Sequence, residues 1–494
     1  MIWTFAITSA ALFMVALDNL VVTTALPVIK HDLGASLSGL EWTVNAYTLT
    51  YAVLLLTGAA LGDRYGRRRV FVIGLVVFVA GSAAAALAPG IGSLVVARAA
   101  QGVGGAIVTP LSLTIMSAAM PRERRGLALG AQGGVSGLGV AIGPLVGGAV
   151  VQGLSWQWIF WINVPIGLIL LPLAVIWLKE TTGPRVSLDL PGLGLAGAGL
   201  FGIVFGLVRG GEHGWAGLDV IGCLIAGGVL LAGFVAREMA TPAPMVPMRF
   251  FRDWPFSAAN LTSLMLFFGL FGSVFLLAQF FQIVQGDGPL QAGLRILPWT
   301  AAPILVAPIA GIASDRIGSR PLLVSGMVLM SAGLAWLAAI TTPTVAYVEM
   351  IAPFLLAGVG MSLMFAPISN VVLSSVTREE EGKASGVNNT VREVGGVFGV
   401  SVLATVFAVA GGYATPQAFV DGLTAAVWVG AAVVGLGALA AMTVPGRPHL
   451  VPRPNPAADE PAPVETHAPN PRSPAAPAAR PRSARNTGGE DQPR

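Results

Sequence analysis

The sequence is poor in the residues that soluble enzymes need most. Only 11% of its 494 residues are charged, and it contains one cysteine and four histidines. A soluble globule carries about 25% charged residues, so this chain is not one. The lone cysteine, Cys223, excludes a disulfide framework, and so little cysteine and histidine argues against a zinc site or a nucleophilic dyad. We expect no metal and no cofactor.

The chain also lacks the phosphate-binding loop of an ATP-driven pump. No Gly-x-x-x-x-Gly-Lys-Ser/Thr motif occurs in it, so a nucleotide's phosphates would find no cradle. Its net charge of +4 is explained by membrane topology, because cytoplasmic loops of membrane proteins carry excess Lys and Arg. We therefore expect a proton or ion gradient as the energy source, and no nucleic-acid partner.

Long apolar runs fill most of the chain, and hydrophobic residues make up 54% of it. About fourteen runs of roughly 18–25 residues fit before the last fifty residues, each long enough to cross a hydrocarbon core as a helix. Alternating ten-residue strands, the pattern of a membrane barrel, are absent. The sequence predicts an all-α membrane protein with about 14 transmembrane helices in a lipid bilayer.

Two stretches of the sequence occur twice. Residues 58–69 read GAALGDRYGRRR and are echoed by GIASDRIGSR at 311–320. Residues 101–126 resemble residues 357–382, with an offset of 256 (357 − 101). The first six and last six helices are therefore expected to form two related bundles, with two helices inserted between them. Parallel repeats of this kind, with a substrate site at their interface, are an architecture of secondary transporters.

Four segments follow from these patterns. We expect an N-terminal six-helix bundle over 1–178, two inserted transmembrane helices over 179–240, a C-terminal six-helix bundle over 241–443, and a disordered cytoplasmic tail over 444–494. The tail is assigned by its abrupt change to Pro, Ala, Arg and Ser.

Basic residues gather in alternate loops. The set comprises Arg64, Arg67, Arg68, Arg69, Arg122, Arg124, Arg125, Lys179, Arg185, Arg237, Arg249, Arg252, Arg316, Arg320, Arg378 and Lys383. By the positive-inside rule these loops are cytoplasmic, and an even number of helices puts both termini on that side too. We expect a multi-pass protein of the plasma membrane that works as a monomer.

Several of these stretches resemble the major facilitator superfamily, and more closely its fourteen-helix drug:proton antiporters. Residues 58–69 are similar to the family's GxLaDrxGrk loop, residues 94–106 to its lxxxRxxqGxga pattern, and residues 17–27 to lDxTxxNxALP. The chain departs from the last pattern at Leu20 and Thr23. The resemblance covers nearly everything except the tail, and implies a transporter that exports drugs or antibiotics in exchange for protons.

The loop at residues 58–69 is predicted to be a cytoplasmic gate. A carboxylate at a helix end can accept hydrogen bonds from the next helix or pair with an arginine, and moving two bundles requires contacts that break and re-form. The alternative is a simple stop-transfer loop. The residues assigned to the gate are Asp63, Arg64, Gly66, Arg67, Arg68, Asp315 and Arg316.

Asp18 and Arg98 are predicted to form the proton-coupling site. An arginine inside a membrane helix is costly unless it has a partner. Asp18 lies about 12 Å and Arg98 about 9 Å from the outer ends of their helices, at a rise of 1.5 Å per residue, so their depths agree. An Asp whose Arg partner moves between conformations can take up and release a proton. A permanent structural ion pair is the alternative, and Glu393 is a second proton-site candidate.

The fifth predicted helix carries closely spaced small residues: Gly139, Gly143, Pro144, Gly147 and Gly148. Small residues let helices approach closely, and a proline permits a bend. Ordinary helix packing is the alternative interpretation. The pattern is similar to the family's gxxxGPxxGG motif, and the resemblance implies export rather than import.

A substrate cavity is expected to include Gln101, Asn388, Asn389 and Arg392, although a structural network between helices explains the last three equally well. We expect small amphipathic organic substrates that are neutral, zwitterionic or singly cationic, because acidic residues inside the membrane are few. The predicted function is proton-coupled export by alternating access. The alternative is an inward nutrient or metabolite symporter of the same fold, since a fold does not fix function. Buried charges argue against a scaffold, and the missing catalytic constellation argues against an enzyme.

Overall fold

The computed structural model describes residues 2–121, 125–183, 189–242, 244–377 and 380–446. Over these residues the chain is a series of helices joined by short loops, and none of them forms a strand. Fourteen helical spans are long and apolar enough to cross a membrane. The predicted all-α membrane fold is therefore confirmed. The residue boundaries predicted for the four segments stay predictions, and the tail from 447 onward lies outside the described residues.

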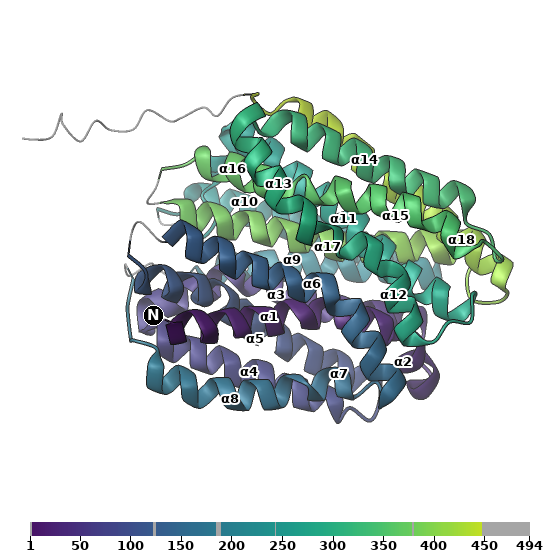
Figure 1. Cartoon of the computed structure of the whole chain (residues 1–494), viewed down its shortest axis with the longest axis horizontal. Coiled ribbons are helices and arrows are strands. Elements are labelled where there is room, and N and C mark those ends of the chain that lie inside the picture. Colours follow the sequence, from purple (N-terminus) through teal and green to yellow (C-terminus); the bar gives the residue numbers. More distant parts are fainter. Residues whose placement is uncertain (1, 122–124, 184–188, 243, 378–379, 447–494) are drawn as a thin grey trace, which may run out of the picture. The chain divides into compact units, whose positions relative to one another are not determined.

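The N-terminal half provides the first six spans. They are α1 (Ile2–Val21) with η1 (Val22–Thr24), α3 (Leu37–Tyr65), α4 (Arg67–Ala86), α5 (Ile91–Ala119), α6 (Arg125–Gly153), and α7 (Trp158–Trp161) with α8 (Asn163–Trp177). A short helix, α2 (Leu26–Leu33), links the first span to the second. These helices are the purple to blue ribbons of Figure 1.

Two helices without a counterpart follow, α9 (Leu190–His213) and α10 (Leu218–Ala240). They pack on each other, and α9 also lies against α3 and α17, one helix from each half. The contact between α9 and α3 includes an aromatic pair, with the ring centroids of Trp42 and Phe201 5.4 Å apart. The inserted pair therefore flanks the line where the two halves meet.

The C-terminal half provides the last six spans. They are preceded by η3 (Met248–Arg252) and comprise α11 (Trp254–Ile283), α12 (Pro289–Thr300) with α13 (Ala302–Ile317), α14 (Ser319–Ile340), α15 (Tyr347–Ser362) with α16 (Phe365–Ser374), α17 (Glu381–Ala410) and α18 (Pro416–Met442). α12 and α13 are separate helices because Pro298 and Pro303 flank their junction, and each proline removes a backbone hydrogen bond.

Corresponding glycines pack alike in the two halves. A Cβ on Gly102 of α5 would lie 2.5 Å from the carbonyl oxygen of Tyr47 on α3. A Cβ on Gly358 of α15 would lie 2.7 Å from the carbonyl oxygen of Trp299 on α12. Both distances are far below van der Waals contact, so only glycine lets these helix backbones approach so closely. The internal repeat therefore extends from the sequence to helix packing.

The two halves meet along α3 and α17 and along α6 and α12. Asn45 donates to the Ser401 hydroxyl at 2.9 Å, and the Thr300 hydroxyl donates to the Ala141 carbonyl at 2.9 Å. A Cβ on Gly293 of α12 would lie 2.3 Å from the Pro144 carbonyl oxygen of α6. We call this α6–α12 contact the distal seam, because it lies at the end of the bundle away from the arginine-rich loop.

α6 is packed unevenly along its length. Gly133, Gly134 and Gly137, in the half of α6 nearer the arginine-rich loop, are exposed and have no atom within 4 Å of an added Cβ, although Gln132 beside them is buried. In the distal seam, by contrast, Gly148 and Gly293 bring the backbones of α6 and α12 close together. The described conformation is thus closed between α6 and α12 at the distal end and open beside these three glycines.

Candidate functional site

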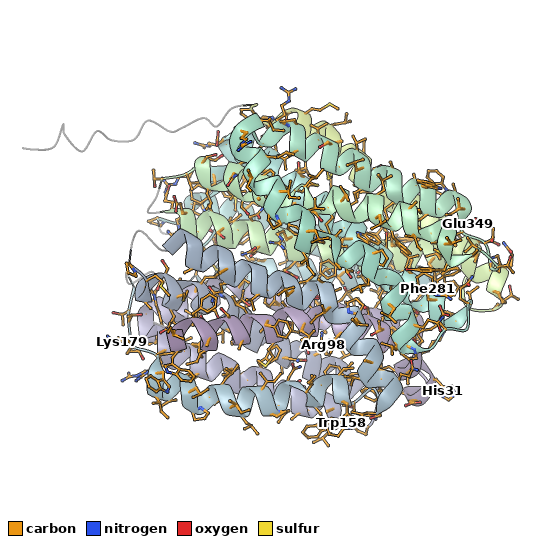
Figure 2. The ribbon with its side chains drawn as sticks, viewed as in Figure 1. His31, Arg98, Trp158, Lys179, Phe281 and Glu349 are labelled. Atoms are coloured by element: carbon orange, nitrogen blue, oxygen red, sulfur yellow. The ribbon has the colours of Figure 1, made fainter. Side chains whose placement is uncertain are left out.

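The predicted pair of charges lies inside the N-terminal half. Arg98 Nη1 donates to Asp18 Oδ2 at 2.5 Å, and the two side chains are 1% and 0% exposed. Asp18 comes from α1 and Arg98 from α5, two helices that pack against each other. Figure 2 shows Arg98 in the interior of the bundle, between Lys179 toward one end and His31 toward the other. The equal depths calculated from the sequence therefore agree with the direct contact between these two side chains.

Further polar groups complete the hydrogen bonding of Asp18. Gln101 Nε2 and Asn163 Nδ2 donate to its Oδ1 at 2.8 and 2.9 Å. The same two amides donate to the Ser82 hydroxyl at 3.2 and 3.0 Å, and that hydroxyl donates onward to the Phe160 carbonyl at 2.9 Å. The carboxylate thus accepts three hydrogen bonds, from α5 and α8. We call Asp18, Arg98, Gln101, Asn163 and Ser82 the buried network.

Arg98 is also fully engaged. Its Nε donates to the Thr43 carbonyl at 3.2 Å and its Nη1 to Gln101 Oε1 at 2.7 Å, and its guanidinium lies 4.2 Å from the ring centroid of Tyr47. Removing two charges from water is costly unless geometry and further hydrogen bonds compensate. The network supplies this compensation, with a cation–π contact in addition.

The structure gives Gln101 a different place from the one expected. The sequence assigned it to a substrate cavity, but its amide oxygen accepts from Arg98 and its amide nitrogen donates to Asp18 and Ser82. It has no exposed surface. A side chain engaged at both ends and sealed from solvent cannot contact a substrate in this conformation, so Gln101 belongs to the buried network.

The arginine-rich loop is held by the segment that follows α8. Asp63 Oδ1, at the end of α3, accepts from Arg67 Nε, at the start of α4, at 2.8 Å. The backbone then pairs with the segment after α8: Gly183 N donates to the Asp63 carbonyl at 3.0 Å, and Arg67 N donates to the Thr181 carbonyl at 2.9 Å. Gly66 adopts φ +107° at the turn between α3 and α4, a conformation that favours glycine.

Glu180 is the acidic partner that the sequence prediction missed. Its carboxylate accepts from the backbone amides of Arg68 and Arg69, at 3.0 and 3.2 Å, at the start of α4. A carboxylate at a helix N-terminus satisfies free amides and interacts favourably with the helix dipole. Its oxygen also lies 3.7 and 3.8 Å from the Nε atoms of the same two arginines. The loop is therefore anchored by the segment that joins the N-terminal bundle to the inserted helices.

The other predicted gate residues lie around this end of the bundle. The Arg64 guanidinium lies 5.4 Å from the Tyr65 ring centroid. Arg316 is exposed at the end of α13. Asp315 lies on the same helix, but its side chain is outside the described residues. Nothing among the described contacts tests a latch between halves, which stays a prediction.

The small residues of α6 contact both halves. An added Cβ would lie 2.9 Å from the Phe13 carbonyl oxygen at Gly139, 3.0 Å from Leu20 Cβ at Gly143, and 2.5 Å from the Val21 carbonyl oxygen at Gly147. These three glycines face α1.

The next small positions face the other half. An added Cβ at Gly148 would lie 2.3 Å from the Pro289 carbonyl oxygen, and the Pro144 carbonyl oxygen meets Gly293 in the distal seam. The motif therefore lets α6 pack closely on the helix that carries Asp18 and on α12 of the other half.

Polar residues of α17 fall into two groups. Asn388 is buried and donates to Asn260 Oδ1 at 3.1 Å and to the Ser263 hydroxyl at 3.0 Å, both on α11. Asn389 instead accepts from Arg392 Nη1 at 3.3 Å. Asn388 thus serves a contact between helices, whereas Asn389 orients an arginine.

Among the described residues Glu393 makes no hydrogen bond with the buried network, although Tyr47, which lies against Arg98, interacts electrostatically with both Asp18 and Glu393. It interacts electrostatically with Tyr47 and Tyr51 of α3 and faces Asn19 of α1. Its Oε2 is enclosed and has no hydrogen-bond partner among the described residues. The two proton-site candidates are therefore separate: Asp18 is sealed inside one half, and Glu393 of the C-terminal half faces the N-terminal half.

Comparison with known proteins places this arrangement in a family. The sequence profile described as "Major Facilitator Superfamily" matches residues 8–400, with a second match over 288–482. The chain belongs to the Major Facilitator Superfamily. It is thus a multi-pass membrane transporter of this superfamily, which agrees with the resemblance seen in the motifs.

Curated relatives in the superfamily match most of the chain. The "Tetracenomycin C resistance and export protein" of Streptomyces glaucescens is 34% identical over 402 residues, 81% of this chain and 74% of the relative. "Multidrug resistance protein Stp" of Mycobacterium tuberculosis is 35% identical over 407 residues, 82% of this chain and 75% of the relative. The "Cephamycin export protein CmcT" of Amycolatopsis lactamdurans is 36% identical over 407 residues, covering 80% and 82%.

Solved structures of the superfamily share the fold. A peptide transporter crystallised with sulfate aligns with a TM-score of 0.66 at 15% identity, covering 89% of this chain and 94% of its own. A D-xylose–proton symporter aligns with a TM-score of 0.63 at 15% identity, covering 90% and 98%. At such low identity these likenesses concern the fold alone.

Proposed function

We propose that this protein exports amphipathic organic compounds, antibiotics or drugs among them, from the cell in exchange for protons. The curated relatives named for tetracenomycin C export, multidrug resistance and cephamycin export support export as the direction. The glycine and proline motif of α6 supports it by resemblance.

The single observation that carries proton coupling is the sealed Asp18–Arg98 pair. A carboxylate with no exposed surface is held by an arginine and two amides inside a membrane bundle. Such a group is costly to bury, and charged groups at this depth mark ion and proton pathways in transporters. Asp18 would bind the incoming proton, and Arg98 would compensate its charge when the proton leaves.

The orientation belongs to the same proposal. The arginine-rich loop and both termini would face the cytoplasm by the positive-inside rule, and the protein would act as a monomer in the plasma membrane. The distal seam would then be the closed outer gate, and the open stretch of α6 would face inward. Asp63, its arginines and Glu180 would act at the inner gate when the halves rock about the fixed site.

Transport in sealed vesicles of known orientation tests the function. Inside-out vesicles carrying the protein should accumulate a dye or antibiotic when their interior is acidified, and the arriving substrate should discharge the pH gradient. A protonophore should abolish both signals. Substrate that moves out of the vesicles together with protons would instead establish the inward symporter. A vesicle panel in which no compound moves would overturn both.

A further inference from the structure

A second arginine in the membrane lacks the partners that Arg98 has. Arg392 lies on α17, about 16 Å along the helix from its first residue at 1.5 Å per residue. Its guanidinium lies 4.3 Å from the ring centroid of Phe267 on α11 and 5.7 Å from that of Phe365 on α16. Both rings belong to the same half as Arg392, so the arginine is held in place by its own bundle.

The hydrogen bonding of Arg392 is incomplete. Its Nη1 donates to Asn389 Oδ1 at 3.3 Å, and its Nε is enclosed without a partner among the described residues. Over the described residues, no carboxylate oxygen lies within 4.0 Å of its guanidinium nitrogens. Arg98, by contrast, has a carboxylate at 2.5 Å and two further acceptors. A cation at this depth without a carboxylate in direct contact attracts an anion strongly, because the surrounding dielectric is low.

The geometry leaves the donor edge of the guanidinium for that anion. Aromatic rings contact a guanidinium through its flat face, whereas its N–H groups point outward in its plane. This edge is the part that recognises a carboxylate or another oxyanion, often with two parallel hydrogen bonds. With Phe267 and Phe365 beside the guanidinium and Asn389 on one nitrogen, Nε stays unbonded.

The neighbouring glutamate does not fill this role. Successive residues of a helix point about 100° apart, and Glu393 faces Asn19 of α1 and Tyr51 of α3. Arg392 interacts electrostatically with Glu393 and with Tyr51, but within the described residues the Glu393 carboxylate makes no hydrogen bond or ion pair with it. Arg392 Nε and Glu393 Oε2 are both enclosed without a hydrogen-bond partner, on the helix that packs along α3 of the N-terminal half.

We propose that Arg392 binds an acidic group of the exported compound, a carboxylate or an ionised phenol on an otherwise apolar, ring-bearing skeleton. This inference rests on the proposed export function and goes further by naming the substrate's charged group. It differs from the sequence-based expectation of neutral, zwitterionic or cationic substrates, which counted acidic residues in the membrane and gave no weight to an arginine without a bonded carboxylate. The anion supplies the hydrogen-bond acceptor that the protein leaves open at Arg392 Nε.

Equilibrium binding to the full-length protein in lipid nanodiscs tests the proposal. The probes are 2-naphthoate and anthraquinone-2-carboxylate, each compared with its methyl ester, which keeps the rings and removes the charge. Wild type should bind at least one acid about tenfold more tightly than its ester, the scale of a charge-assisted hydrogen bond. Arg392→Gln should erase that preference by weakening the acid and leaving the ester unchanged, and Arg392→Lys should keep part of it, because charge remains while the planar fork is lost.

Arg209→Gln is the matched control. Arg209 is half exposed and paired with Asp219 within the inserted helices, at 2.8 Å, so its loss removes an arginine without touching α17. It should leave the acid preference intact. The wild-type comparison needs no variant, so the test holds even if Arg392→Gln folds poorly.

Two results would overturn the proposal. One is a panel in which no acid binds more tightly than its ester, including a panel in which nothing binds. The other is a folded Arg392→Gln protein that loses acid and ester equally. Neither touches the export function, which the vesicle assay measures separately with uncharged and cationic dyes.

Discussion

Arg98 and Phe354 occupy corresponding positions of the two halves, 256 residues apart (354 − 98), in very different surroundings. Arg98 donates to the carbonyl of Thr43. Phe354 stacks on Trp299, with ring centroids 6.1 Å apart, and Trp299 stands 256 residues after Thr43 (299 − 43). The same pair of helix positions is thus polar in one half and aromatic in the other.

This difference separates the requirements of the fold from those of the chemistry. Gly102 and Gly358 hold the same helix approach in both halves, so the repeated frame depends on small residues. The C-terminal half fills the equivalent space with Phe354, Trp299 and Phe281, whose rings are stacked and tilted on one another. The frame does not need an ion pair at this position, and we infer that the N-terminal half keeps one there for proton coupling.

The largest effect is expected when the buried ion pair of the N-terminal half is replaced by apolar residues, as in the C-terminal half. Arg98→Met should destabilise the protein by about 3–5 kcal/mol, because it leaves Asp18 buried and unpaired. The double variant Asp18→Leu with Arg98→Met should recover much of the unfolding midpoint temperature in detergent but no proton-driven export. A double variant that exports at the wild-type rate would contradict a coupling role for the pair.

The next largest effect is expected from Asp18→Asn. An amide keeps most of the hydrogen bonds with Gln101 and Asn163 but cannot carry a proton, so proton-driven export should fall about 100-fold, the lower end of what a positioned proton-transfer group contributes. The measurement is dye accumulation in acid-loaded inside-out vesicles. Asp421→Asn, on an exposed carboxylate bonded to Gln417, is the matched control and should export normally. Unchanged coupling in Asp18→Asn would leave a structural ion pair as the explanation.

A smaller effect is expected at the distal seam. Gly293→Ala places a Cβ 2.3 Å from the Pro144 carbonyl oxygen, and such overpacking typically costs about 1–3 kcal/mol. The closed seam should open more often. A cysteine introduced by Ala141→Cys in a Cys223→Ser background should therefore react faster with a thiol reagent.

Gly137→Ala on the open stretch of α6 is the control for the seam. Nothing lies within 4 Å of its added Cβ, so the labelling rate at position 141 should not change. Equal labelling in Gly293→Ala and wild type would mean that this glycine contact does not hold the seam.

The smallest effect concerns pH at the distal end. Burial lowers the pKa of Lys30 from its ordinary value of 10.5 to about 8, and its ammonium lies 2.9 Å from the ring centroid of Tyr413 in the other half. Burial disfavours the charged form of Lys30 when the distal seam is closed. The free-energy cost that this adds to the closed state is constant below pH 8 and disappears as the pH rises toward 10.5. The cation–π attraction opposes this change and reduces it.

Labelling of the same seam cysteine should therefore slow modestly as pH rises from 7 to 9.5, after correction for the reactivity of the thiol itself. Lys30→Met should remove the pH dependence while leaving labelling at pH 9.5 close to wild type. Faster corrected labelling at high pH would show that the cation–π contact outweighs burial.

Much of the fold could be predicted from the sequence because the patterns that indicate it lie along the chain and do not depend on which side chains meet in space. Run length and composition predict helices, and the repeat predicts two halves. Helix depth at 1.5 Å per residue brought Asp18 and Arg98 to one level. Depth says nothing of rotation about the helix axis, which decides which side chains meet. Asn163, Ser82 and the placement of Gln101 depend on that rotation.

Glu180 was missed for a different reason. It follows α8 in a stretch without periodicity, and its function depends on the loop returning to the start of α4 more than a hundred residues earlier in the chain. A signal existed in principle, since free amides at a helix start attract a carboxylate. The sequence alone does not indicate which of several nearby acids arrives there. Asn163 was also missed, although it is the one polar residue in the stretch 162–165 and so could have been singled out as a candidate.

The partners of Asp18 all come from its own half, on α5 and α8. If the two halves turned as rigid bodies, Asp18 would keep all of its hydrogen-bond partners and would remain as inaccessible to solvent as before. In the proposed mechanism, proton loading at Asp18 therefore requires α1 to move relative to α5 and α8 inside the N-terminal half. α6 meets α1 through glycines, without side chains between the two backbones, and α1 passes into the 3₁₀ turn η1 at its end. The N-terminal half would thus change its internal conformation in addition to rotating against the other half.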